Sequence, residues 1–235
     1  MPTADPCGIN TRTTLHQSPS HGTLQGMNNR QTYRATIRQG IYLIVLILLV
    51  FLFWQVGDAY KSATVQEYGL FETAQSVVLF LIALSFGIQA AENKTYRAIL
   101  ILLCGLALAA LIREQDAYFD NHLPYIGWTW CWIFPITGLV LLVRQLRKET
   151  TFFVHFLRSH SFHMMMTALI IIIPVAQCLG HRSFLQDLLE SPGMDSHLVR
   201  RIMEEPIELL GYLQILLASI ESALELRTNK NRICQ

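Results

Sequence analysis

The chain has 235 residues and a formal net charge of +1, and 52% of its residues are hydrophobic while only 15% are charged. This composition indicates a membrane protein rather than one or two soluble domains. The basic residues form no dense tract, so the charge pattern predicts no nucleic-acid partner. The five cysteines are widely spaced and predict neither a disulfide framework nor a CxxC metal site.

The chain begins with a polar segment, residues 1–33, that is rich in Thr, Ser, Asn, Gln, His and Gly. It contains almost nothing that could form a core, which is typical of a disordered tail. The first apolar block begins only at Ile41, so the sequence predicts no cleaved secretory signal peptide.

Long apolar segments then alternate with short polar ones. A lipid core of roughly 30 Å needs about 20 helical residues at a rise of about 1.5 Å each, so each apolar segment is a candidate spanning helix. The predicted fold class is all-α: a polytopic membrane helix bundle over residues 34–226, followed by a cytoplasmic tail at 227–235. The six predicted transmembrane helices cover about 39–57, 70–91, 97–113, 125–143, 163–180 and 206–224.

The sixth predicted span has the shortest uncharged run of the six. Its uncharged run, Leu209–Ile220, has 12 residues, or roughly 18 Å of helix. To cross a bilayer, the helix must take in Glu208 and Glu221, which is costly unless both carboxylates face protein or water. A five-helix arrangement with an interfacial final helix is therefore the alternative.

The distribution of basic residues separates these two arrangements, because short cytoplasmic loops carry an excess of Lys and Arg. With six spans and both termini inside, 13 of the 18 basic residues lie on the inner side and 5 on the outer side. With five spans the division is 10 against 8. The count favours six spans, so the lipid bilayer is the expected partner.

Acidic residues show the reverse bias, with 12 of 17 on the predicted outer side. Glu72 opens the second span, the polar stretch Arg113–Asp120 closes the third, and Glu204–Glu208 opens the sixth. Three helix ends could therefore converge at the outer face. Carboxylates also stabilise helix N-termini through the backbone dipole, so Glu72 and Glu205 could act only as caps.

The densest polar stretch, Arg113–His122, is the main candidate for chemistry. If it is helical, Arg113, Asp116 and Asp120 share one face, which suits either an ion-pair network or a coordinating site. The ion-pair network is the favoured interpretation; a site for a divalent cation is the alternative. The catalytic candidates are Glu72, Arg113, Glu114, Asp116, Asp120, Glu205 and Glu208, and the metal-ligand candidates are Asp116, Asp120, His122 and Glu208.

Two further features concern the two membrane faces. Residues 182–203 read as an outer amphipathic segment of two short helices around the turn at Ser191–Gly193. His160 and His163 lie near the predicted inner end of the fifth span, on the opposite side from the acidic residues. One site therefore cannot contain both the acidic cluster and these histidines.

The stretches 67–83, 113–120 and 204–224 resemble uncharacterised polytopic inner-membrane proteins of bacteria. Those proteins pair a glutamate-opened helix with an acidic motif after the next span. One such group carries Glu-Glu-Ile-Ser-Trp-Gly-Gln-Arg where this chain has Arg113–Asp120, and the Trp-Gly-Gln-Arg half is absent here. A looser resemblance, in general architecture only, is to the membrane hydrolase superfamily of alkaline ceramidases, whose HxxxH pair is absent among the outer histidines.

Three functional classes follow from the sequence. The first is a structural or partner-binding membrane protein with a carboxylate-rich outer site. The second is a metal-dependent hydrolase that acts on lipid. The third is a transporter of a small solute or ion, which is less favoured because the second to fifth apolar segments offer only small polar residues, such as Ser76, Ser85, Gln89, Thr137 and Gln177.

Overall fold

The computed structural model describes residues 36–49, 51, 70–115, 131–176, 178 and 196–233. Every regular element in these ranges is a helix, and the described ranges contain no strand. The predicted all-α class is therefore confirmed for this part of the chain. The predicted tail at 1–33 lies outside it.

The helices follow the apolar segments of the sequence, with several differences at the boundaries. Helix α6 (Thr151–Leu157) was not expected from the sequence, and η2 (Ile171–Val175) is a π-helical turn that contains Pro174, whose missing N–H cannot continue the α-helical ladder. The helices of the described residues are Thr36–Leu49, α2 (Leu70–Glu92), α3 (Arg97–Glu114), α5 (Ile133–Leu146), α6 (Thr151–Leu157), α7 (His160–Ile170), η2 (Ile171–Val175) and α10 (Ser196–Ile233).

Helix α10 is the longest element, at 38 residues. It begins at Ser196, so residues 196–203 form its first turns rather than a separate short helix, and it continues past the predicted end of the sixth span at 224. The rest of the predicted amphipathic segment, residues 182–195, lies outside the described residues.

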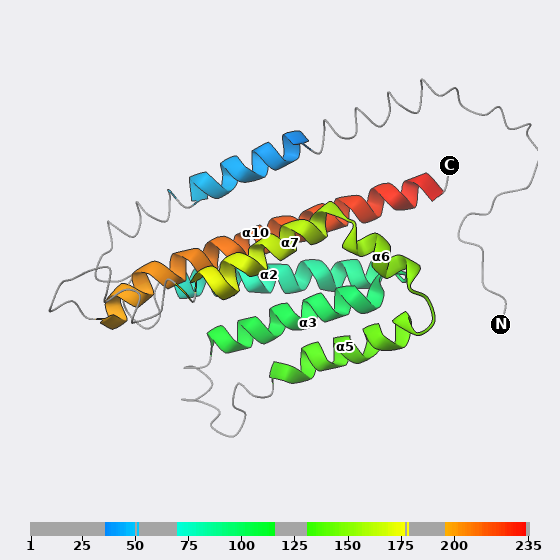
Figure 1. The fold of residues 1–235 in the computed structure, drawn as a ribbon, viewed down its shortest axis with the longest axis horizontal. Coiled ribbons are helices and arrows are strands. Elements are labelled where there is room, and N and C mark those ends of the chain that lie inside the picture. Colours follow the sequence, from blue (N-terminus) through cyan, green and yellow to red (C-terminus); the bar gives the residue numbers. More distant parts are fainter. Residues whose placement is uncertain are drawn as a thin grey trace, which may run out of the picture.

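The helices form a bundle in which consecutive long helices run in opposite directions (Figure 1). Helix α2 packs against α3, α3 against α5, and α10 against both α2 and α7. Helices α2 and α10 run parallel: Gln75 Nε2 donates to the carbonyl of Glu205 at 3.0 Å, and Gln89 Nε2, further along α2, donates to the carbonyl of Ser219, further along α10, at 3.0 Å. We call the end with Glu114 and Glu205 the acidic end, and the end with Glu92 and Arg227 the basic end.

The core of the bundle lies between α2, α3 and α10. Its most deeply buried large side chains include Leu79, Ile82 and Phe86 of α2, Leu100 of α3 and Leu209 of α10. Burial of such aliphatic and aromatic groups removes apolar surface from water or lipid and fixes the helices face to face.

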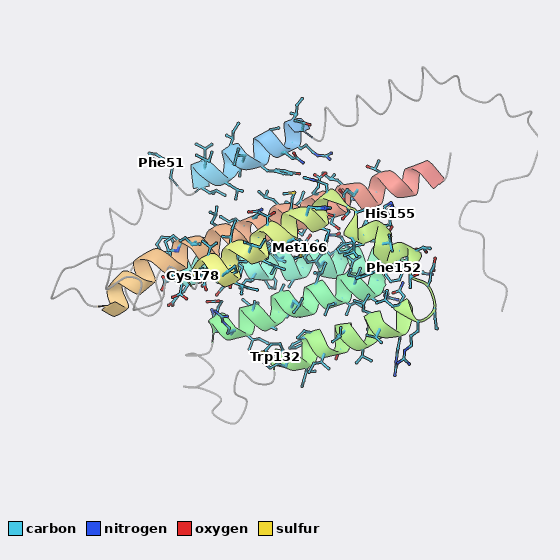
Figure 2. All side chains as sticks on the ribbon, viewed as in Figure 1. Phe51, Trp132, Phe152, His155, Met166 and Cys178 are labelled. Atoms are coloured by element: carbon cyan, nitrogen blue, oxygen red, sulfur yellow. The ribbon has the colours of Figure 1, made fainter. Side chains whose placement is uncertain are left out.

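The outward faces of the helices are also apolar. Leu43, Phe80, Ile136 and Ile173 are each more than half exposed, and so is Trp132, which lies at the edge of the bundle in Figure 2. Soluble monomers rarely expose apolar patches larger than a few hundred square ångströms. Lipid tails would cover this surface, so the chain is associated with a membrane.

By length and composition, two of the described helical segments can cross a membrane: Phe71–Glu92, with 22 residues, and Glu204–Thr228, with 25. A third would result if Thr151–Leu157 and His160–Val175, which meet at a bend of 61°, form one broken span. The apolar helices Thr36–Leu49 and Ile133–Leu146 are shorter in the part of the chain that is described.

Glycines allow α3 and α5 to approach closely. A Cβ atom at Gly138 would lie 2.5 Å from the Cα of Leu102, and a Cβ atom at Gly105 would lie 2.7 Å from the carbonyl oxygen of Phe134. Helix pairs in membranes are commonly held by such backbone approaches over small residues. The contact fixes α3, and with it the polar residues at its C-terminal end.

Candidate functional site

The acidic end brings charged side chains of α3 and α10 together. Arg113 Nη2 lies 3.8 Å from Glu114 Oε1 and 3.8 Å from Glu208 Oε1. The hydroxyl of Tyr212 donates a hydrogen bond of 3.1 Å to Glu114 Oε1. We call these four residues the acidic-end cluster.

Helical spacing explains how α10 contributes two members of this cluster. Glu208 and Tyr212 are four residues apart and therefore lie on the same face of α10. That face is turned toward the last turn of α3, where Arg113 and Glu114 are found.

The members of the cluster differ in exposure. Glu208 is 7% exposed and Tyr212 is also buried, whereas the side chain of Arg113 is 58% exposed. A buried carboxylate is costly unless a counter-charge or hydrogen bonds compensate it. Here the guanidinium provides the counter-charge from the rim while the Tyr212 hydroxyl provides a hydrogen bond from within.

Amide side chains fasten α2 to both partners at this end. Gln75, which is buried, donates to the carbonyl of Glu205, and Gln115 Nε2 donates to Ser76 Oγ at 2.6 Å. These bonds hold the first turns of α2 next to the cluster. The first turn of α2 also carries Glu72.

Of the catalytic candidates, the structure brings Arg113, Glu114 and Glu208 together, while Glu205 joins the same region through its backbone carbonyl. The candidates Asp116, Asp120 and His122 lie outside the described residues, so the predicted metal site stays a prediction. Within the described ranges, no group of three or more His, Cys, Asp or Glu side chains could hold a metal ion.

The basic end holds a second buried carboxylate that was not among the predicted site residues. Glu221 of α10 is 3% exposed and forms an ion pair with Arg38 of the Thr36–Leu49 helix. Tyr42 of the same helix donates to Glu221 Oε2 at 3.2 Å. The pair joins the first described helix to α10, from which it is separated by more than 180 residues.

A third carboxylate, Glu225, attaches α10 to the start of α7. Its oxygens accept from Ser161 Oγ at 2.8 Å and from the backbone N–H of His160 at 3.1 Å. The first N–H groups of a helix have no partner within the helix, so a carboxylate there satisfies one of them. His160 therefore lies at the basic end, away from the acidic-end cluster.

Two buried carboxylates thus lie on α10, and both lie within the sixth predicted span, which needs them to face protein or water. Glu208 and Glu221 face protein, at 7% and 3% exposure. One sequence signal could have marked the face of Glu208: Glu208, Tyr212, Ser219 and Ser222 recur at intervals of three, four and seven residues, which places them on one stripe of a helix. Glu221 lies on a different side of α10, toward Arg38, and no such spacing marks it.

Comparison with known proteins adds no family to this description. No protein-family model, curated protein or solved structure matches the chain. The resemblances to bacterial inner-membrane proteins and to the alkaline ceramidase superfamily therefore stay predictions.

Proposed function

We propose that the chain is a multi-pass protein of a bacterial inner membrane, with six spans, both termini in the cytoplasm and the acidic end at the outer face. Three observations support this. Consecutive long helices alternate in direction (Figure 1), Glu208 and Glu221 of α10 are buried against protein, and the 13 to 5 distribution of basic residues favours this orientation.

For the outer face we propose a structural and partner-binding role rather than catalysis. The observation that carries it is the position of Arg113, whose guanidinium lies 3.8 Å from the carboxylates of both Glu114 and Glu208. The guanidinium of Arg113 balances the negative charge of these carboxylates, and the Tyr212 hydroxyl donates a hydrogen bond to Glu114. Such a network orders helix ends and needs no metal.

Elemental analysis separates this role from a metal-dependent hydrolase. The detergent-purified chain is compared with the triple variant Asp116→Ala, Asp120→Ala and Glu208→Ala by mass spectrometry of metals. The structural role predicts no stoichiometric zinc or manganese in either protein. Stoichiometric metal in the natural chain that is lost from the variant would contradict it and would favour lipid hydrolysis.

Site-directed photo-crosslinking tests the partner-binding part of the proposal. A photoreactive residue at Gln115, at the rim of the acidic-end cluster, is expected to give one discrete crosslinked product in native membranes, and Arg113→Ala is expected to reduce its yield. A matched probe at Lys148, at the basic end, should not give that product. The same product from both positions would contradict a partner site at the outer face.

Transport of a small solute or ion is the second candidate, because buried polar residues lie inside the two apolar spans. Gln89, Ser219 and Glu221 are all buried at the basic end, and ionisable groups at membrane depth are commonly functional. On α2, the fully buried apolar side chains of Leu79, Ile82 and Phe86 separate these polar residues from the acidic-end cluster, so a transport path would have to open between them. Flux into proteoliposomes above that of empty vesicles would favour transport.

A further inference from the structure

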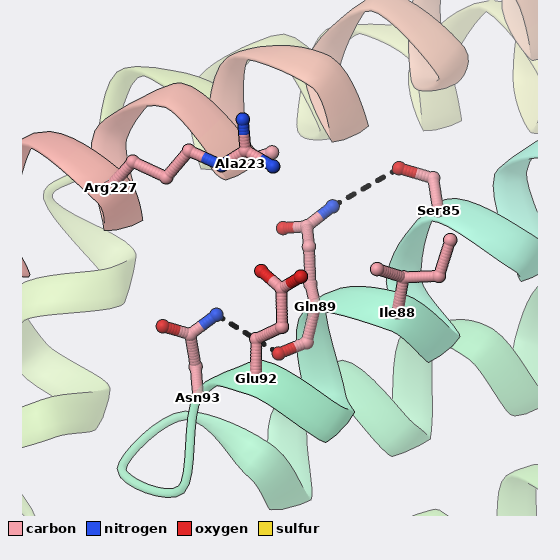
Figure 3. A pocket seen from close by; sticks show the side chains of 7 residues that line it. All are labelled: Ser85, Ile88, Gln89, Glu92, Asn93, Ala223 and Arg227. Carbon is pink, nitrogen blue, oxygen red and sulfur yellow. Dashed lines mark hydrogen bonds between the residues drawn. The ribbon is translucent and has the colours of Figure 1, made fainter.

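A cavity of about 340 Å³ lies between the basic ends of α2 and α10 (Figure 3). Its lining includes Gln89, Glu92 and Asn93 from the end of α2, and Arg227 from α10. None of these residues belongs to the acidic-end cluster, so the cavity is separate from the outer site.

Gln89, one of the lining residues, carries an unpartnered acceptor, and Figure 3 shows its amide oxygen turned away from Ser85. The residue is 4% exposed, and its Nε2 donates to the carbonyl of Ser219 at 3.0 Å and to Ser85 Oγ at 3.1 Å. A carbonyl can only accept, so the amide nitrogen must face Ser219 and the oxygen must point away from it. Gln89 Oε1 is buried and has no hydrogen-bond partner among the described residues.

A buried amide oxygen without a donor lowers stability, so a ligand that donates a hydrogen bond to it is favoured. The donor must be an N–H or O–H group that reaches the cavity floor. Glu92, another lining residue from the same end of α2, adds a carboxylate to the cavity (Figure 3). An ammonium group satisfies both neighbours, because it donates hydrogen bonds and carries the opposite charge to Glu92.

The other wall of the cavity is basic. Arg227 reaches in from α10, and in the described part of the chain neither Arg227 nor Glu92 belongs to an ion pair. A guanidinium is suited to binding phosphate oxygens. The cavity therefore matches a zwitterion that carries an ammonium and a phosphate.

The position of the cavity indicates where such a zwitterion comes from. Glu92 and Arg227 lie at the last turns of the two segments long and apolar enough to cross a membrane, where lipid headgroups lie. Ile88, also on the cavity wall, is 50% exposed on the apolar surface of α2. We infer that this cavity binds the headgroup of a phospholipid with a primary ammonium, which donates to Gln89 Oε1 and Glu92 while its phosphate accepts from Arg227.

Native mass spectrometry of the full chain tests the inference with two lipids of matched acyl chains. Phosphatidylethanolamine has a primary ammonium, whereas the trimethylated ammonium of phosphatidylcholine has no N–H to donate. One charge-assisted hydrogen bond corresponds to about tenfold in affinity, so we expect about tenfold more phosphatidylethanolamine than phosphatidylcholine adduct at equal concentrations. Equal adducts of the two lipids would overturn the inference.

Variants assign the two halves of the headgroup. Glu92→Gln keeps the shape of the side chain but removes its charge, and it should lower the preference for the primary ammonium. Arg227→Gln should weaken both adducts and leave their ratio unchanged, because both lipids carry a phosphate. Arg144→Gln, an exposed arginine in the last turn of α5 away from the cavity, is the matched control. Equal effects of all three variants would overturn the site.

A variant of Gln89 and a soluble competitor complete the test. Gln89→Met removes the acceptor and should lower the preference as Glu92→Gln does, although it also removes the donor to Ser219; Glu92→Gln keeps the test valid if Gln89→Met does not fold. Displacement of the lipid by an equal concentration of free phosphoethanolamine would assign the site to a soluble compound and overturn the lipid as its ligand, because a lipid that is also held by its acyl chains binds more tightly than its headgroup alone. Failure to displace it would assign the site to the membrane lipid.

Discussion

The two ends of the bundle hold buried carboxylates in different ways. At the acidic end, Glu208 is balanced by an arginine whose side chain is 58% exposed and 3.8 Å away. At the basic end, Glu221 is paired with an arginine whose side chain is 38% exposed, and it also accepts from Tyr42. Both ends use α10 for the carboxylate, but only the basic end requires the Thr36–Leu49 helix.

This difference indicates that the ends have different tolerance to change. The acidic-end cluster is open on its arginine side, so water can replace part of what a substitution removes. The basic-end pair is more enclosed, and the loss of one partner leaves a charge buried without compensation. Four substitutions test the comparison, from the largest expected effect to the smallest.

Gly138→Leu should have the largest effect, because any Cβ at this position meets the backbone of Leu102 at 2.5 Å. Overpacking against a backbone that cannot yield should cost about 3 kcal/mol of unfolding free energy. Displacement of α3 should loosen the acidic-end cluster, which needs Arg113, but not the ion pair of Arg38 with Glu221.

Hydrogen exchange measured by mass spectrometry on the purified protein checks this expectation. Exchange should rise in α3 and in the first half of α10 but not around Glu221. Gly40→Ala is the matched control, since a Cβ atom there has no neighbour within 4 Å. Uniform loss of protection along α10 would contradict the separation of the two ends.

Arg38→Met should be the next largest. It keeps the aliphatic length of the side chain but leaves Glu221 without its counter-charge, at a cost of about 2 kcal/mol after allowance for the partial exposure of Arg38. The measurement is thermal unfolding in detergent. Pairing it with Glu221→Gln should recover most of the loss, and a double variant less stable than Arg38→Met would disprove the pairing.

Glu208→Gln should cost less, about 1 kcal/mol, because its guanidinium partner is largely exposed and 3.8 Å away. A double-mutant cycle with Arg113→Gln, measured by the same unfolding assay, gives the coupling of the pair. Coupling as large as that between Arg38 and Glu221 would remove the proposed difference between the ends.

Tyr212→Phe should have the smallest effect, about 0.5 to 1 kcal/mol, since it removes one hydrogen bond to Glu114 and leaves the ring packed. Tyr42→Phe is the corresponding change at the basic end, where Tyr42 bonds to Glu221. Unfolding in denaturant compares the two. A larger loss from Tyr212→Phe would reverse the order expected from the comparison.

Much of the helical architecture was predictable because the lengths of apolar segments carry it directly. The approach of Arg113 and Glu114 to Glu208 has a similar origin. Because consecutive spans run in opposite directions, the end of the third span and the start of the sixth lie at the same end of the bundle. The single long α10 was not predicted, because a separate amphipathic segment was expected up to residue 203 and a new helix was expected to open at Glu204–Glu208, yet one helix runs through both and through Pro206.

The basic end was largely missed, for a physical reason. The pairing of Arg38 with Glu221 joins residues that no local spacing relates, and the bonds of Gln89 to Ser219 and Ser85 depend on the register of α2 against α10. The contact of Gly138 with Leu102 likewise arises only when α3 and α5 pack. Such features follow from tertiary packing, which a single sequence does not reveal.

The most direct test of the proposed topology is to determine, by cysteine labelling, on which side of the membrane each end of the bundle lies. Single cysteines at Gln115, Lys148 and Thr228, in a chain whose natural cysteines are replaced by Ser, are exposed in intact cells to a maleimide that cannot cross the inner membrane. Six spans with both termini inside predict labelling at 115 from outside, and labelling at 148 and 228 only after the inner membrane is opened. Labelling of 228 together with 115 in intact cells would contradict six spans with both termini inside.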